Sequence, residues 1–140
     1  MARQIQRVEQ VIRYVLQPGN ILFTPGRGDP PDNQVEFYVT GLDADGIRVS
    51  KVAGQLVAWR ALEGVIPYLQ ARNGAVRIGA TNNIAAPGTL ESYLRNESGS
   101  ATRTANYVAP ILAAAGVVEY IQEGQAKHIR LIPPYMENPP

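Results

Sequence analysis

The sequence contains no cysteine and only one histidine, His128. The lack of cysteine excludes disulfide scaffolds, thiol catalysis and cysteine-ligated metal sites, and one imidazole cannot supply a site built from several histidines. Thirteen Lys and Arg against twelve Asp and Glu leave a formal charge of +1, so no strong field marks the whole chain as a nucleic-acid or membrane binder. The N-terminal segment has no apolar run long enough for a signal peptide or membrane span, which favours a cytoplasmic protein with no membrane contact.

A hydrophobic content of 45% and a charged content of 18% are typical of a globular domain. In the first half, apolar residues recur at helical spacing from Ile5 to Leu16 and predict a helix over about 3–17 that ends at Pro18-Gly19. We expect this helix to cover the neighbouring sheet or to pair with a second copy. Alternating residues at 35–40 and 47–52 flank an Asp-Gly turn, so residues 20–59 predict a meander of three or four strands.

The second half predicts mostly helices. One helix is expected to begin after Trp59, although Gly64 and Pro67 weaken this prediction. An edge strand is expected over 76–80. Thr89 is placed to cap a helix over 89–95, and Thr102 or Thr104 to cap a helix over 102–115 that Pro110 should bend. Strands at 117–122 and 128–132 flank a polar tip. The predicted class is α+β, with a helix and meander over 1–59, a second unit over 60–133 and a tail over 134–140.

The order of elements from residue 60 to 132 resembles the winged-helix superfamily, in which a helix-turn-helix is followed by a β-hairpin wing. Three segments carry the resemblance, namely Gly88–Leu94, Thr102–Val108 and Ala115–Glu119, where a helix runs through glycine directly into a strand. The resemblance implies that the helix over 102–115 enters the major groove of duplex DNA. It also implies that the wing over 117–132 contacts the backbone or the minor groove.

On this resemblance the protein is a non-enzymatic DNA-binding module that needs no cofactor. Arg103 and Asn106 are the candidates for reading bases, because guanidinium suits guanine and carboxamide suits adenine. The resemblance also implies phosphate contacts from two groups of residues. The first group is the hydroxyls of Thr102, Thr104 and Tyr107, and the second is the wing residues Lys127, His128 and Arg130. The complete set of implied DNA-binding residues is Thr102, Arg103, Thr104, Asn106, Tyr107, Lys127, His128 and Arg130, with Arg77 and Arg95 flanking the same surface.

The same residues leave an alternative open. Residues 76–140 carry five Lys and Arg and five Glu, a balance unusual for a DNA binder. The expected outward face of the helix over 102–115 includes Pro110, Ala113 and Ala114, which suit the close approach of another protein. The alternative is therefore a protein-interaction or homodimerisation subunit that uses this face. A further candidate phosphate contact is Arg27, which lies among glycines in the loop 24–33.

Overall fold

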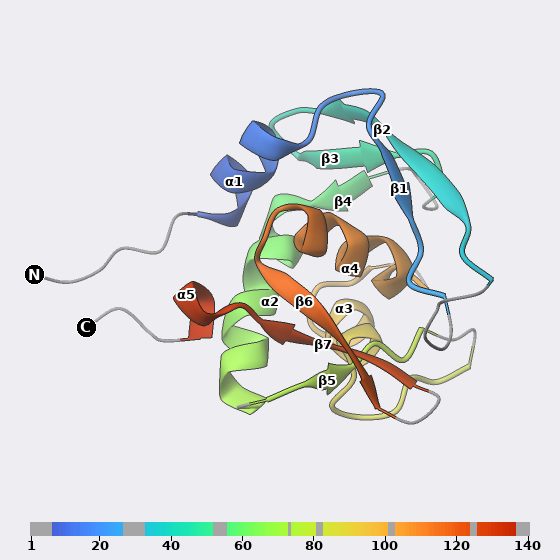
Figure 1. Cartoon of the computed structure of the whole chain (residues 1–140), viewed down its shortest axis with the longest axis vertical. Coiled ribbons are helices and arrows are strands. Elements are labelled where there is room, and N and C mark those ends of the chain that lie inside the picture. The colour runs from blue at the N-terminus through green and yellow to red at the C-terminus, as the bar shows by residue number, and fades with distance from the viewer. Residues whose placement is uncertain are drawn as a thin grey trace, which may run out of the picture.

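The computed structural model describes residues 7–26, 33–51, 56–72, 74–80, 83–100, 103–123 and 126–136. Helices and antiparallel sheets make up the chain, which confirms the predicted α+β class (Figure 1). The elements, in chain order, are α1 (Val8–Val15), β1 (Ile21–Phe23), β2 (Glu36–Leu42), β3 (Gly46–Val49), β4 (Leu56–Ala58), α2 (Trp59–Arg72), β5 (Val76–Arg77), α3 (Leu90–Asn96), α4 (Ala105–Ala114), β6 (Val118–Glu123), β7 (Ala126–Leu131) and α5 (Pro133–Met136).

The first sheet is a four-stranded antiparallel meander in the order β1-β2-β3-β4, as the alternating segments predicted. Asp43 organises the turn between β2 and β3, because its Oδ1 accepts hydrogen bonds from the backbone N–H groups of Asp45 and Gly46. Residue 46 must be glycine, since a Cβ there would lie 2.2 Å from the carbonyl oxygen of Val57 on β4. The Asp-Gly step therefore sets both the reversal and the close approach of β3 to β4.

Helix α1 is shorter than predicted and packs elsewhere. Arg7 has an extended backbone, so the helix begins at Val8, and residues 1–6 lie outside the described residues. Val8 and Ile12 are buried, and the main contacts of α1 are with α2 and α4. The expectation that this helix covers the meander is therefore wrong. Its C-terminal half reaches the meander, where the Arg13 guanidinium donates a 2.7 Å hydrogen bond to the Asp43 carbonyl.

Helix α2 runs unbroken through Pro67. Gly64 has a packing role, because a Cβ at this position would lie 2.0 Å from the hydroxyl oxygen of Tyr93 on α3. That hydroxyl donates a 3.0 Å hydrogen bond to the carbonyl of Ala61. The glycine that weakens the predicted helix is thus the residue that allows α3 to approach it.

The second sheet has the order β5-β7-β6, with the β6–β7 hairpin paired as far as Glu123 and Ala126. Only residues 124 and 125 separate the strands, so the expected five-residue tip over 123–127 is too long. Strand β5 lies at an edge, as predicted, and β7 lies in the centre. His128 therefore lies in the central strand of this sheet.

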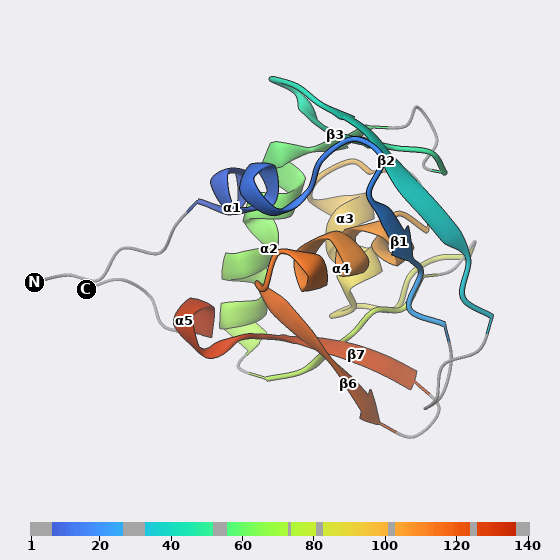
Figure 2. The same ribbon diagram turned by 45° about the horizontal axis from the view of Figure 1, so that its top comes forward.

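Helix α4 lies between the two sheets, as both views show (Figures 1 and 2). It contacts β1 on one side and β6 on the other, and most of its residues are buried. Pro110 is among the buried residues, which corrects its expected outward position. Of residues 105–114 only Ala114 is exposed. The small apolar residues of α4 fill the core between the sheets instead of forming an open face.

The buried apolar residues form one cluster that draws on α1, both sheets and helices α2 to α4. Helix α5 was not predicted, because two prolines indicated only the end of the sheet. Its Tyr135 packs against the cluster, and the Tyr135 carbonyl accepts a 2.9 Å hydrogen bond from Gln70. Among the described residues, no helix has the length and apolar character needed to cross a membrane.

Candidate functional site

A hollow of about 900 Å³ opens at the end of the second sheet, beside the start of α4. Its walls come from segments far apart in the sequence: the loop after β1, the strand β5 and the residues after it, the turn before α4, and the β6–β7 hairpin. The described residues that line it are Thr24, Pro25, Gly26, Asn33, Val35, Arg77, Ile78, Gly79, Ala80, Arg103, Asn106, Tyr107, Glu123, Ala126 and Lys127. Both predicted halves of the chain therefore contribute to one site.

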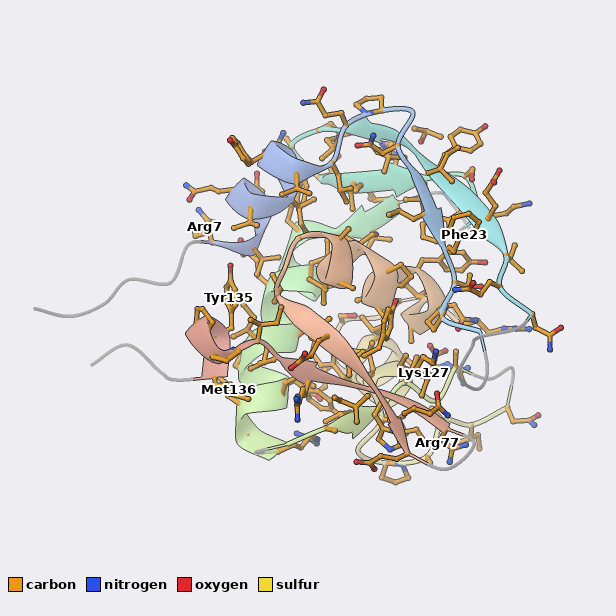
Figure 3. All side chains as sticks on the ribbon, viewed as in Figure 1. Arg7, Phe23, Arg77, Lys127, Tyr135 and Met136 are labelled. Atoms are coloured by element: carbon orange, nitrogen blue, oxygen red, sulfur yellow. The ribbon has the colours of Figure 1, made fainter. Side chains whose placement is uncertain are left out.

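Three cationic residues line the hollow, each from a different element. Arg77 comes from β5, Arg103 from the turn before α4, and Lys127 from β7. Figure 3 shows Arg77 and Lys127 at the same end of the second sheet. Glu123 is the one carboxylate among the described lining residues, so cations outnumber acids three to one. The ion pairs of the described chain include neither Arg77 nor Arg103.

Arg103 is held by a buried carboxylate that the sequence did not single out. Glu91 on α3 is fully buried, and its Oε2 accepts a 2.5 Å hydrogen bond from the Arg103 backbone N–H. Its Oε1 accepts a second bond, 3.1 Å long, from the N–H of Ala105. Glu91 thus caps α4, whereas Thr104, one of the two expected caps, makes no capping hydrogen bond with its side chain.

Arg95, expected to flank a DNA surface, completes this arrangement instead. Its Nε lies 2.6 Å from Glu91 Oε2, and its Nη1 donates to the Asn83 carbonyl. The side chain is 15% exposed, which leaves it to support α3 and α4 rather than to meet a ligand. The i,i+4 spacing of Glu91 and Arg95 on a helix was the available signal for this pair.

Asn106 and Tyr107 belong to the first turn of α4 and are half-buried in the wall of the hollow. The Tyr107 ring meets the Phe37 ring edge to face, with centroids 5.1 Å apart and an interplanar angle of 83°. Phe37 is buried in β2, so the first sheet fixes the orientation of Tyr107. The site therefore depends on contact between the meander and α4.

Lys127 lies on the strand face, not at a hairpin tip. It shares the face of β7 with buried Ile129 and Leu131, and its Nζ lies 5.7 Å from the centroid of the Tyr120 ring. Burial raises the pKa of the Tyr120 hydroxyl, so this ring stays neutral beside the ammonium group. A neutral aromatic face attracts the cation and helps to position it at the hollow.

His128 and Arg130, the other predicted residues of the wing, lie on the opposite face of β7, which is also the face of Arg77 because Arg77 pairs with His128. Arg130 Nε lies 2.8 Å from Glu119 Oε2, and His128 Nε2 lies 3.5 Å from Glu123 Oε2. Neither residue lines the hollow. Thr104 is buried, and both Thr102 and Arg27 lie outside the described residues. Of the eight implied DNA-binding residues, the structure brings together Arg103, Asn106, Tyr107 and Lys127.

The backbone around the hollow is unusual. The two non-glycine residues of the described chain with positive φ are Asn33 at 56° and Arg103 at 66°, and both line it. Gly26 and Gly79 in the same walls have φ of 71° and 64°. Left-handed conformations are costly for residues with a side chain and tend to cluster at functional sites. This clustering strengthens the case for a binding site.

The chain matches no protein-family model, and neither a curated protein nor a solved structure is significantly similar to it. The winged-helix resemblance therefore rests on the order of elements from α2 to β7. Within the described residues, no group of three or more His, Asp or Glu side chains is arranged to hold a metal ion.

Proposed function

We propose that this protein is a module that binds nucleic acid through its phosphates at the cationic hollow. The observation that carries the proposal is the convergence of Arg77, Arg103 and Lys127 from three elements on one site with a single described carboxylate. Phosphate neutralisation by Lys and Arg supplies most of the sequence-independent affinity for nucleic acid. A local cluster of this kind serves that purpose even though the whole chain is nearly neutral.

The proposed mode differs from the one that the winged-helix resemblance implies. In the helix-turn-helix mode the recognition helix lies in the major groove, whereas the body of α4 is buried between the two sheets. Only its first turn, with Asn106 and Tyr107, reaches the hollow. We expect phosphate to bind at the cationic side chains and not at the N-terminus of α4. The Glu91 carboxylate already accepts hydrogen bonds from the backbone N–H groups of Arg103 and Ala105 there, so these groups are not available to a phosphate.

Fluorescence anisotropy with a labelled random-sequence duplex, titrated at 50 and 200 mM salt, tests the proposal. The double variant Arg77→Ala and Lys127→Ala should bind more weakly, and the slope of log affinity against log salt should become shallower by about one unit per lost phosphate contact. The matched control is Arg60→Ala with Lys51→Ala, which removes two exposed cations that do not line the hollow. Equal losses in the two double variants, or no binding at 50 mM salt, would refute the proposal.

A second candidate function, dimerisation, is favoured by an apolar surface on the first sheet. Ile21 on β1 and Tyr38 on β2 are cross-strand partners and are 56% and 49% exposed. Phe23 lies two residues further along β1 and is 50% exposed (Figure 3). Strand β1 is also the edge of its sheet, and an exposed apolar edge strand is a common place for another chain to pair.

This candidate moves the expected protein interface from α4 to β1 and β2. Light scattering should give the mass of two chains for the unmodified protein and of one chain for Phe23→Glu. The control is Tyr14→Glu, which replaces an aromatic residue that is 87% exposed on α1. A monomeric mass for the unmodified protein across a wide concentration range would rule out the dimer.

A further inference from the structure

We propose that the hollow receives an unpaired nucleotide, from a single strand or from the overhang of a duplex, in preference to the side of an intact double helix. This inference rests on the proposed function, because it specifies which form of nucleic acid the same site takes. Three features of the hollow support it: its concave shape, the side chains in its wall, and the position of its cations.

The shape of the site suits a small inserted group. A volume of about 900 Å³ is within the range of pockets that enclose most of a small ligand. An intact duplex presents a convex backbone and is read by elements that project into its grooves. No projecting face is available on α4, because its body is buried between the sheets. A base that leaves the stack can enter the hollow, whereas a base pair within a duplex cannot.

The wall of the hollow offers the groups that recognise an unpaired base. Tyr107 provides an aromatic ring held by Phe37, and stacking on aromatic rings is the usual way in which proteins hold unpaired bases. The Asn106 carboxamide lies one residue earlier and carries both a donor and an acceptor for a base edge. Gly79 and Ala80 also line the hollow, and because they carry no side chain or only a methyl group they leave room for a sugar and a base.

The cations are placed for the backbone of the same strand. Arg77 and Lys127 lie on adjacent strands at one end of the second sheet, and the register Arg77↔His128 places their side chains on opposite faces of it, so they flank this end from two sides. Arg103 comes from the turn before Asn106 and Tyr107. A strand whose base enters between these groups brings its flanking phosphates toward cations on both sides. This combination of a cationic groove and an aromatic ring is typical of single-strand binding.

The experiment compares three labelled DNAs by fluorescence anisotropy at one salt concentration: a mixed-sequence single strand, the blunt duplex containing it, and that duplex with a 3′ overhang. The single strand and the overhang duplex should bind about ten-fold more tightly than the blunt duplex. Tyr107→Leu, which keeps an apolar contact with Phe37, should remove most of this preference. Asn106→Ala, at a half-buried position, should reduce it without affecting folding, and Tyr14→Leu is the control.

The outcomes separate this inference from the proposed function. Equal affinity for the three DNAs, with weakening by Arg77→Ala and Lys127→Ala, would overturn the inference and leave the proposed function standing. A single-strand preference that survives both Tyr107→Leu and Asn106→Ala would also overturn it, because the unpaired base would then bind elsewhere. No binding to any of the three DNAs would refute both.

Discussion

The buried carboxylate of Glu91 accepts a 2.5 Å hydrogen bond from the backbone N–H of Arg103, twelve residues further along the chain. This bond joins α3 to the turn before α4 and holds Arg103 at a φ of 66°. The left-handed conformation is uncommon for a residue with a side chain, so it persists only where surrounding contacts stabilise it. Glu91 therefore supports both the packing of two helices and the placement of one cation of the hollow.

Glu91→Ala should destabilise the protein by about 3–5 kcal/mol, because it leaves two backbone N–H groups and the Arg95 guanidinium without their buried acceptor. Urea unfolding followed by circular dichroism measures the free energy of unfolding. The control is Glu97→Ala, an exposed carboxylate at the end of α3, which should change stability by less than about 0.5 kcal/mol. Similar losses in the two variants would show that Glu91 does not support α4.

Gly79 provides a second test of how the hollow is built. Its φ is 64°, and a Cβ at this position would lie 2.8 Å from the Cβ of Thr89, whose hydroxyl caps α3. Gly79→Ala should therefore combine backbone strain with displacement of the cap, costing about 2–4 kcal/mol. The matched control is Gly88→Ala, where φ is 82° and nothing lies within 4 Å of the added Cβ.

Thermal unfolding of both glycine variants distinguishes the two effects. Gly88→Ala reports the strain alone, about 1–2 kcal/mol, and the difference between the variants reports the contact with Thr89. If Gly79→Ala melts at the same temperature as Gly88→Ala, then Thr89 moves aside at no cost and the cap does not depend on this glycine.

The elements that the sequence predicted well are those specified by neighbouring residues. The Asp43 to Gly46 turn lies between alternating segments, and the structure places a β-hairpin there. Thr89 caps α3 as expected, since its hydroxyl accepts the N–H of Ser92 at 3.1 Å. In both cases the side chain acts on a backbone group within three residues, so the local sequence contains the necessary information.

The features that the sequence missed depend on residues far apart in the chain. The burial of α4 requires β1, more than 80 residues earlier, and nothing in the alanine-rich face of the helix indicates that a sheet covers it. Lys127 was expected at a hairpin tip, but pairing continues to Glu123 and Ala126, which turns Lys127 toward the hollow. The site itself is formed by four separate segments, and only tertiary packing brings them together.

The turn at Asp43 should make stability depend on pH. The Arg48 guanidinium, whose Nε lies 2.7 Å from Asp43 Oδ2, and the backbone N–H of Asp45 lower the pKa of the Asp43 carboxyl below its ordinary value of 3.8. Because the folded-state pKa is lowered, the stabilisation is complete above about 3.8 and declines as the pH falls toward the folded-state value. Urea midpoints of the unmodified protein and of Asp43→Asn should therefore differ most near neutral pH and converge in acid. Parallel pH profiles would contradict this assignment.

A substitution in α1 can show whether this helix is part of the core or forms a contact between two copies of the chain. Val8 is 2% exposed and faces α2 and α4, so Val8→Asp places a carboxylate in the core and should cost about 3–5 kcal/mol. Tyr14→Asp, at the 87% exposed position, is the control and should change stability by less than about 0.5 kcal/mol. Urea unfolding gives the stabilities, and light scattering gives the mass of each variant. A charge in the core must lower the free energy of unfolding. If Val8→Asp instead kept the unfolding curve of the unmodified protein and only halved the mass measured by light scattering, α1 would be an interface between two copies.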